Sequence, residues 1–239
     1  MRAGLVLTST ISQYTMAQQQ QRHVFITGAT GYVGSRLVPI LLSRGHRVTA
    51  LTREESRHKL PKGCEVVIGN ALDGASYRHF LNGSDTFVQL VGVAHPGPAK
   101  ARQFVEIDLK SGLEAVKVAA AAAVSHFVYV SVAHPAPVMK AFIEVRSQCE
   151  QAIEESGLNS TILRPWYVLG PGHRWPYLLI PFYKIMEAWP STRASARRLG
   201  LVTLAQMVNA LAESVDRPPQ GIRILEVPEI GTRPGPSAS

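Results

Sequence analysis

The stretch VFITGATGYVGSRL, residues 24–37, decides the fold. Three glycines, Gly28, Gly31 and Gly34, follow a short apolar strand pattern at an even spacing of three, and a helical pattern comes after them. Gly28 permits a tight turn, Gly31 lets the main chain approach a pyrophosphate, and Gly34 lets the helix pack closely on the strand. Because the N-terminus of the helix offers free amides to phosphate, we predict that this turn binds a dinucleotide.

Short β-rich runs alternate with longer helical patterns along the chain. This alternation is typical of crossover helices between parallel strands, so we predict an α/β fold with a doubly wound parallel sheet. The predicted strands are HVFIT (23–27), RVTALT (47–52), EVVIG (65–69), TFVQLV (86–91), HFVYVSV (126–132) and STILR (160–164). The predicted helices span residues 32–44, 75–81, 100–123 and 138–156.

The two ends of the chain differ in composition from its middle. The apolar stretch within residues 1–15 is shorter than the core of a signal peptide, and Met16 opens a glutamine-rich run. We expect residues 1–21 to be a disordered leader or the product of an upstream start that was chosen wrongly. Residues 231–239 have the Pro, Gly and Ser content of a flexible tail. A single domain over residues 22–230 is expected between them.

Composition excludes several classes of protein. Hydrophobic residues make up 46% of the 239 residues and charged residues 18%, and no apolar run is long enough for a membrane span. The formal net charge of +8 favours anionic ligands, but the basic residues are scattered and form no nucleic-acid-binding motif. Cys64 and Cys149 are too few for a disulfide framework and lack metal-ligand spacing. We therefore predict a cytoplasmic protein with no integral membrane segment, no metal site and no nucleic-acid partner.

Four motifs resemble those of the extended and atypical short-chain dehydrogenase/reductases, an NAD(P)-binding group that includes NmrA-like and epimerase/dehydratase-like members. TGATGYVG (27–34) is similar to the TGxxGxxG signature of the group. GNALD (69–73) resembles the GDxxD stretch that borders the adenine, with Asn70 in place of an Asp. HFVYVSV (126–132) resembles the fifth strand, and SGLNSTILRPWYVLGPG (156–172) resembles the passage after the catalytic helix. The resemblance implies a Rossmann domain that binds NAD(P).

The same resemblance implies a small C-terminal substrate lobe from about residue 165. Within it, residues 175–190 are rich in aromatic and aliphatic side chains; they could line an apolar pocket, face a partner or touch a membrane, and we favour packing on the sheet. Residues 201–215 resemble the strand and helix that cap the lobe, and a last strand is expected at 222–227. These segments leave the small-molecule substrate or protein partner unidentified.

The choice between NADP(H) and NAD(H) depends on the end of the second strand. There an acid would bind the ribose 2′-hydroxyl, whereas a base would bind a 2′-phosphate. Arg53 stands at this position, and Glu54 and Glu55 beside it are the opposing signal, so we favour NADP(H) over NAD(H). The residues predicted to contact the dinucleotide are Gly28, Thr30, Gly31, Tyr32, Val33, Gly34, Arg53, Asn70, Ala71, Leu90, Gly92 and Arg146.

Catalysis in the resembled enzymes uses a serine after the fifth strand and a Tyr and Lys four residues apart on the next helix. Ser131 occupies the serine position, but Phe142 and Arg146 stand where the Tyr and Lys belong. Phe has no ionisable proton, and a guanidinium does not exchange protons near neutral pH. Arg146 can still bind ribose hydroxyls.

Two hypotheses remain open. The first, which Phe142 favours, is a noncatalytic or weakly catalytic nucleotide-binding protein with a redox-sensing or accessory role. The second is an NAD(P)-dependent oxidoreductase or epimerase/dehydratase-like enzyme for a small carbonyl or sugar-like substrate. In that enzyme a substitute acid would serve, with His95, His134 and Tyr167 as candidates because each follows the carboxyl end of a strand.

Overall fold

A seven-stranded parallel sheet forms the centre of the protein. The structure is a computed structural model that describes residues 20–136, 138–171 and 199–232. The strands lie in the order β3-β2-β1-β4-β5-β6-β9, and the chain crosses from one side of the sheet to the other after β3. Their bounds are β1 His23–Thr27, β2 Arg47–Thr52, β3 Glu65–Ile68, β4 Thr86–Gln89, β5 His126–Val130, β6 Ser160–Arg164 and β9 Ile222–Glu226. This order confirms the predicted doubly wound sheet.

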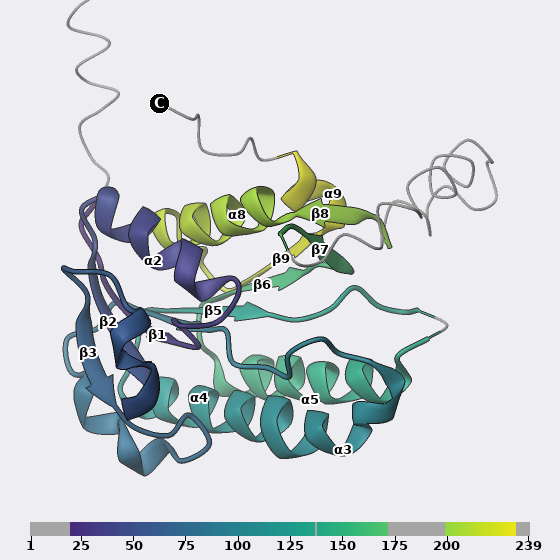
Figure 1. Cartoon of the computed structure of the whole chain (residues 1–239), viewed down its shortest axis with the longest axis horizontal. Helices are drawn as coiled ribbons and strands as arrows, with labels where there is room; N and C mark the ends of the chain where they lie inside the picture. The colour runs from purple at the N-terminus through teal and green to yellow at the C-terminus, as the bar shows by residue number, and fades with distance from the viewer. Residues whose placement is uncertain (1–19, 137, 172–198, 233–239) are drawn as a thin grey trace, which may run out of the picture.

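Helices cover both faces of the sheet (Figure 1). Helices α2 (Gly34–Ser43) and α8 (Leu204–Asp216) form one layer, and α4 (Lys110–Ala121) and α5 (Lys140–Ser156) form the other. Because successive strand residues point to opposite faces, Val24 and Ile26 pack in one buried cluster and Phe25 in the other. Burial on both faces explains why the strand sequences are continuously apolar.

Three of the predicted strands, β1, β2 and β6, have the predicted bounds, whereas β3, β4 and β5 end one or two residues earlier. The predicted helix 75–81 consists of two short 3₁₀ helices, η2 (Gly74–Ser76) and η3 (Arg78–Leu81). The predicted helix 100–123 is composite: η4 (Pro98–Lys100), α3 (Ala101–Gln103), a π-helical segment η5 (Phe104–Leu109) and α4. The periodicity of apolar residues alone does not separate these helix types, because the number of residues per turn differs little between them.

The described C-terminal part is layered on the main sheet. Helix α8 places Met207, Leu211 and Val215 in the same buried cluster as α2 and β1, and β9 is the last strand of the sheet. Two short parallel strands, β7 (Tyr167–Leu169) and β8 (Leu201–Thr203), form a separate pair, and α9 (Val227–Gly231) follows β9. The segment 175–190, most of the predicted leader and most of the predicted tail lie outside the described residues.

His126 is fully buried at the start of β5, on the face covered by α8. Its Nε2 lies 3.0 Å from the hydroxyl of Thr161, and its Nδ1 has no hydrogen-bond partner among the described residues. Burial lowers the pKa of His126 to about 3, and the positive charges of Arg223 and Arg22 act in the same direction. The folded protein therefore holds His126 neutral well below the pH at which the unfolded chain protonates it.

His126 is expected to make the fold sensitive to acid. Between its ordinary pKa of about 6.5 and its folded pKa of about 3, only the unfolded chain binds the proton, so stability falls as the pH falls. The free energy of unfolding should drop by about 1.4 kcal/mol per pH unit in this window. Denaturant titrations of His126→Gln should show a shallower slope below pH 6.5 than the wild type. The exposed control His58→Gln should leave the slope unchanged; an equal slope in His126→Gln would contradict this assignment.

Candidate functional site

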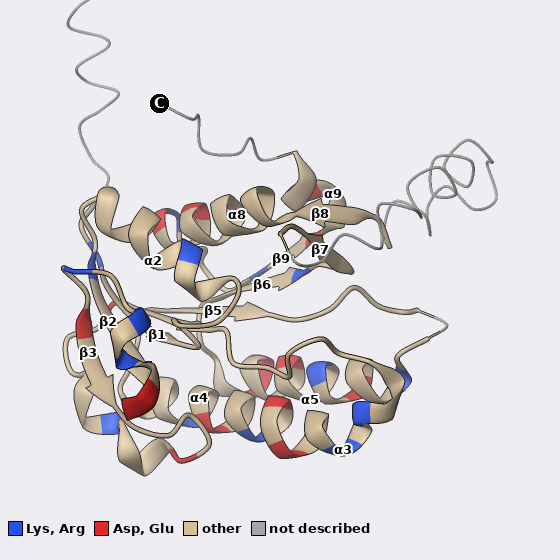
Figure 2. Ribbon diagram, in the orientation of Figure 1, with Lys and Arg blue, Asp and Glu red and all other residues tan. Residues whose placement is uncertain are grey.

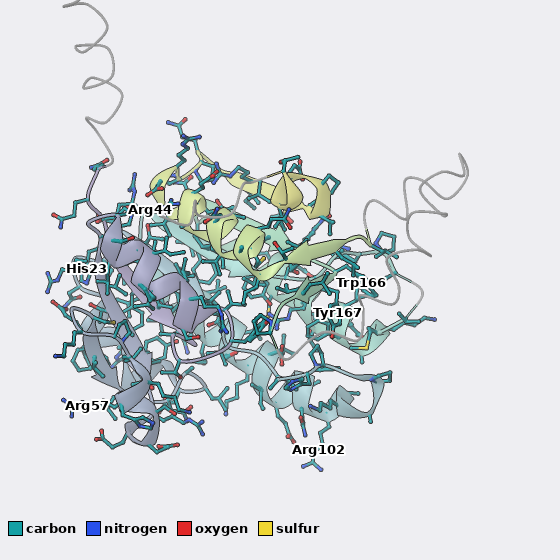
Figure 3. The ribbon with its side chains drawn as sticks, turned by 45° about the horizontal axis from the view of Figure 1, so that its top comes forward. His23, Arg44, Arg57, Arg102, Trp166 and Tyr167 are labelled. Atoms are coloured by element: carbon teal, nitrogen blue, oxygen red, sulfur yellow. The ribbon has the colours of Figure 1, made fainter. Side chains whose placement is uncertain are left out.

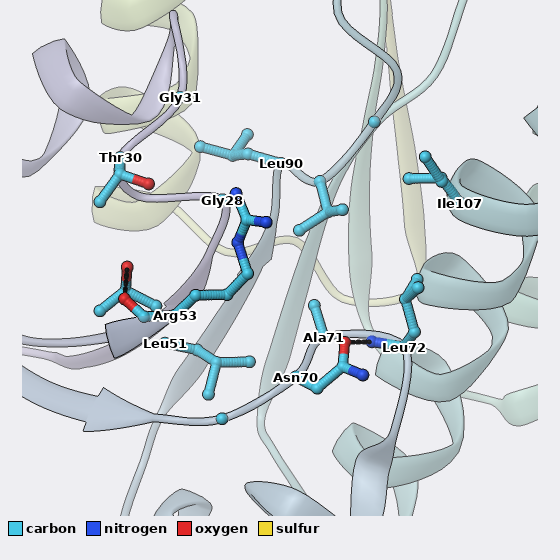
Figure 4. A pocket seen from close by; sticks show the side chains of 14 residues that line it. Gly28, Thr30, Gly31, Leu51, Arg53, Asn70, Ala71, Leu72, Leu90 and Ile107 are labelled. Atoms are coloured by element: carbon cyan, nitrogen blue, oxygen red, sulfur yellow. Dashed lines mark hydrogen bonds between the residues drawn. The ribbon is translucent and has the colours of Figure 1, made fainter. Parts of the chain in front are cut away.

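A cleft of about 370 Å³ opens at the carboxyl ends of β1, β2, β3 and β4. This is the edge at which open α/β sheets bind ligands. The lining residues come from the last two residues of β2, from the loops after these four strands and from η5 (Figure 4). They are Gly28, Thr30, Gly31, Leu51, Thr52, Arg53, Gly69, Asn70, Ala71, Leu72, Leu90, Val91, Gly92 and Ile107.

The glycine turn forms one wall of this cleft. Gly28 has a positive φ of 76°, and a Cβ there would lie 2.7 Å from the backbone carbonyl carbon of Leu90. A Cβ on Gly34 would lie 2.7 Å from the Cα of Ala29, so this glycine brings α2 against the end of β1. Gly31 lines the cleft, and a Cβ there would meet only one atom of the described residues, the carbonyl oxygen of Gly28, at 3.1 Å. The tight turn at Gly28 and the close packing at Gly34 are as predicted from the sequence, and the approach of a pyrophosphate to Gly31 stays a prediction.

The N-terminus of α2 lies directly behind the turn. Val33 is its N-cap residue, and no side chain among the described residues caps it. The first turn of α2 also contains no acidic residue, so its positive dipole end is left for an anion. Tyr32, Val33 and Gly34, all predicted to contact the dinucleotide, lie at this helix start and outside the set of cleft-lining residues.

Arg53 lies at the opposite wall, where β2 ends. Figure 4 shows its side chain reaching across the cleft toward Gly28. The Arg53 side chain is 74% exposed, and its guanidinium lies 3.4 Å from the carboxylate of Glu55. Glu54 and Glu55 belong to the 3₁₀ helix η1 (Glu54–Lys59), and neither is among the residues that line the cleft. A basic group, and no acid, therefore faces the cleft at the end of β2.

The loop after β3 closes the third side of the cleft. The side-chain oxygen of Asn70 accepts a hydrogen bond from the backbone amide of Leu72, at 3.0 Å. This contact is a local turn that an Asp would also form, so the Asn at this position preserves the loop geometry. Ala71, Leu90 and Gly92, which were predicted from the sequence, line the cleft as well.

Arg146, which the sequence resemblance aligns with the Lys position, is engaged in a buried cluster. Its guanidinium pairs with the carboxylate of Asp108 and donates to the carbonyl oxygen of Val130 at 2.7 Å and to the hydroxyl of Tyr129 at 3.3 Å. Burial raises the pKa of Asp108 above its ordinary value, and the charge of Arg146 opposes this rise. Burial also raises the pKa of Tyr129 far above its usual range. Proton exchange near neutral pH is therefore unfavourable at the Tyr129 hydroxyl.

Phe142, at the Tyr position, packs between an aromatic ring and a cation. The centroid of the Phe142 ring lies 4.8 Å from the centroid of the Phe104 ring and 5.0 Å from the guanidinium carbon of Arg146. Because Phe142 and Arg146 are four residues apart on α5, they share one face of the helix, as the sequence predicts. This face contacts η5, which carries both Phe104 and Asp108.

Ser131 follows β5 and is 4% exposed. Its backbone amide donates to the carbonyl of Leu163 at 2.7 Å, and its hydroxyl has no hydrogen-bond partner among the described residues. His134 Nε2 lies 3.5 Å from the carboxylate of Glu150. The three candidates for a substitute acid all lie outside the set of cleft-lining residues: His95, His134 and Tyr167. Figure 3 shows Tyr167 beside Trp166, on the other side of the domain from Arg57.

The sequence did not predict the role of Asp108, nor did it predict six residues that line the cleft: Leu51, Thr52, Gly69, Leu72, Val91 and Ile107. Asp108 lies in FVEIDLKSG, four residues after the buried Phe104, at a helical spacing that predicts a buried face. A buried carboxylate requires a cationic partner, and that signal was available. The partner itself was not predictable, because Arg146 is 38 residues further along the chain.

The described residues contain no helix that is long and apolar enough to cross a membrane. They also contain no group of three or more side chains that could hold a metal ion. Basic and acidic residues are spread over both helical layers, with no single basic stripe in the described part of the chain (Figure 2).

A family model described as NAD(P)H-binding matches residues 28–174, which include the glycine turn, the cleft and α5. The chain belongs to this NAD(P)H-binding family. The match begins at Gly28, the residue whose conformation makes the turn, and it confirms the NAD(P)-binding family that the sequence motifs indicate.

Curated relatives of this family member include enzymes and a chloroplast protein. Ceramide reductase of Caulobacter vibrioides is 29% identical over 160 residues, which are 66% of this chain and 50% of that protein. Protein TIC 62, chloroplastic, of Arabidopsis thaliana is 27% identical over 192 residues, which are 69% of this chain and 30% of that protein. The chain thus matches half or less of the length of these two relatives.

Solved structures share the fold of the family. The WbmH enzyme of Bordetella bronchiseptica, in complex with NAD⁺, aligns with a TM-score of 0.65 at 22% identity and covers 87% of this chain and 76% of that chain. UDP-glucose 4-epimerase of Thermus thermophilus, in complex with NAD, aligns with a TM-score of 0.61 at 18% identity. The alignment covers 85% of this chain and 77% of the epimerase chain. At these identities the likeness establishes the Rossmann fold of this chain.

Proposed function

We propose that this protein binds NADP(H) in the cleft and has little or no catalytic activity of its own, with a redox-sensing or accessory role. The observation that carries the proposal is the state of Arg146. The side chain at the Lys position is buried in an ion pair with Asp108, and the residue one turn before it, Phe142, has no proton to give. The dinucleotide cleft is complete while the acid–base pair beside it is missing. The two free cysteines, Cys64 and Cys149, support a reducing cytoplasmic location as part of the same proposal.

Arg53 supports NADP(H) over NAD(H). Its guanidinium is the charged group that lines the cleft at the end of β2, where the adenosine ribose binds in this fold. A guanidinium forms two parallel, charge-assisted hydrogen bonds to a phosphate, whereas a ribose 2′-hydroxyl is uncharged and cannot form this bidentate pair. The weak 3.4 Å contact with Glu55 on the exposed side leaves Arg53 able to pair with a 2′-phosphate.

Arg53→Ala should weaken NADPH binding much more than NADH binding. A hydrogen bond to a charged group contributes about 1.5 to 3 kcal/mol, so the dissociation constant for NADPH should rise roughly 10- to 150-fold. Isothermal titration calorimetry with both cofactors checks this. Arg57→Ala is the matched control, because Arg57 is an exposed residue of η1 that does not line the cleft. Equal losses for both cofactors would refute the NADP(H) assignment.

An alternative function is an NADP-dependent oxidoreductase for a small carbonyl or sugar-like substrate, related to the epimerases and dehydratases. Ser131 favours it, because its buried hydroxyl lacks a partner among the described residues and is free to accept or donate a hydrogen bond. The name of the ceramide reductase relative also points to reduction chemistry. Oxidation of NADPH in the presence of a panel of carbonyl compounds separates the two functions.

A further inference from the structure

Two residues of the cleft lie directly against the buried ion pair. A Cβ on Gly92 would lie 2.6 Å from Nη2 of Arg146 and 2.9 Å from Oδ1 of Asp108. Ile107 also lines the cleft and immediately precedes Asp108 in η5. The ion pair therefore forms the layer underneath this wall of the cleft.

The ion pair joins four elements that are distant in sequence. Asp108 belongs to η5, and its Oδ2 accepts a hydrogen bond from the backbone amide of Val93, at 3.0 Å, in the loop after β4. Arg146 belongs to α5 and donates to the carbonyl oxygen of Val130 at the end of β5. The side chains of Asp108 and Arg146 are 0% and 9% exposed. Their contacts thus fix the loop after β4 and the π-helical turn relative to the end of β5.

The π-helical geometry of η5 supports a specific role for this arrangement. Six residues, Phe104–Leu109, form the π-helical segment, which places Ile107 in the cleft and Asp108 in the buried pair. π-Helical turns are rare, and they occur frequently at functional sites.

We propose that Asp108 and Arg146 are positioning residues for the dinucleotide: their ion pair holds Gly92 and Ile107 in the geometry that the ligand requires. The identity of the ligand rests on the proposed function. Ordering a mobile side chain or loop residue on binding costs conformational entropy and therefore weakens binding. A cleft wall that is already fixed before the ligand binds avoids this cost. Affinity for the dinucleotide should therefore depend on the pair even though neither residue is among those that line the cleft.

The decisive variant replaces both charges with apolar side chains of similar size, Asp108→Leu with Arg146→Met. Buried ion pairs replaced in this way often cost no stability, whereas a single replacement leaves an unpaired buried charge. We expect the melting temperature of the double variant to stay close to that of the wild type, while the dissociation constant for NADPH rises at least about tenfold. A double variant that is as stable as the wild type and binds NADPH equally well would overturn the proposal.

A second measurement needs no ligand. In the ligand-free wild type, hydrogen exchange at the Val93 amide should be slow because Asp108 accepts its hydrogen bond, and it should become at least about tenfold faster in the double variant. Unchanged exchange at Val93 would overturn the proposal whatever the ligand. If the wild type binds neither NADPH nor NADH, the proposed function fails, and the exchange rate still decides whether the ion pair fixes the loop.

Two further variants guard against a general loss of folding. Asp108→Asn keeps the shape of the side chain and an acceptor for Val93 and removes the charge, so it should also raise the dissociation constant for NADPH. Because it leaves the Arg146 charge unpaired, its melting temperature is measured beside that of the double variant. Arg44→Met with Asp216→Leu removes a comparable ion pair at the far end of α2, where Figure 3 labels Arg44. This control should change neither NADPH affinity nor exchange at Val93. If the control changes NADPH affinity and exchange at Val93 as much as the Asp108 and Arg146 variants do, these changes report a loss of global stability, and the proposal fails.

Discussion

Gly31→Val is expected to remove the binding of both NADPH and NADH, with affinity at least about a hundredfold lower, or about 2.8 kcal/mol. Gly31 lines the cleft, and among the described residues a Cβ there would meet only the carbonyl oxygen of Gly28, at 3.1 Å. The added methyl groups therefore occupy the space in which the main chain meets the pyrophosphate. Calorimetric titration with each cofactor measures the loss. A Gly31→Val protein that binds either cofactor as the wild type does would exclude the turn as the pyrophosphate site.

The matched substitution at Gly34 separates binding from folding. Gly34→Val places side-chain atoms against Ala29 and the carbonyl of Gly28, inside the packing of α2 on β1. Overpacking of this kind costs about 1 to 3 kcal/mol or more, so Gly34→Val should lower the melting temperature by several degrees. Gly31→Val should change it much less. Equal destabilisation by both changes would mean that the binding loss at Gly31 reports on folding alone.

The second large effect concerns hydride transfer. The wild type is expected to show no measurable oxidation of NADPH by carbonyl compounds, and Phe142→Tyr alone should restore little. Phe142→Tyr with Arg146→Lys returns the Tyr and Lys at their spacing of four, but Asp108 would still pair with the ammonium and weaken its effect on the tyrosine pKa. At saturating NADPH, adding Asp108→Asn should raise the rate at least about tenfold over the double variant, since acid–base catalysis contributes about a hundred- to ten-thousand-fold.

Steady-state rates over a panel of carbonyl compounds test this series, with cofactor binding measured in each variant so that lost affinity is not mistaken for lost chemistry. Wild-type turnover at about 1 per second or more would refute the noncatalytic function. In that event, a pH–rate inflection near about 6.5 that disappears in His95→Ala or His134→Ala would locate the substitute acid.

The sequence by itself determined the features that depend on neighbours along the chain. The glycine turn, the bounds of β1, β2 and β6, and the doubly wound sheet were all predictable. Turn conformation and the periodicity of apolar residues are local properties, which a short stretch of sequence contains in full. The position of Arg53 at the cleft was also predictable, because the chain must leave β2 at the carboxyl edge of the sheet.

Only the tertiary structure decided what Arg146 does. From the sequence it was a candidate for the ribose hydroxyls, and the structure shows its guanidinium paired with Asp108 and bound to the carbonyl of Val130. The π-helical turn in Phe104–Leu109 was equally invisible, since its apolar pattern also fits an α-helix. Both depend on which side chains the folded chain brings together across tens of residues. A carboxylate that is expected to be buried requires a cationic partner, and this requirement can be inferred from the sequence. Which residue is the partner depends on the packing of η5 against α5.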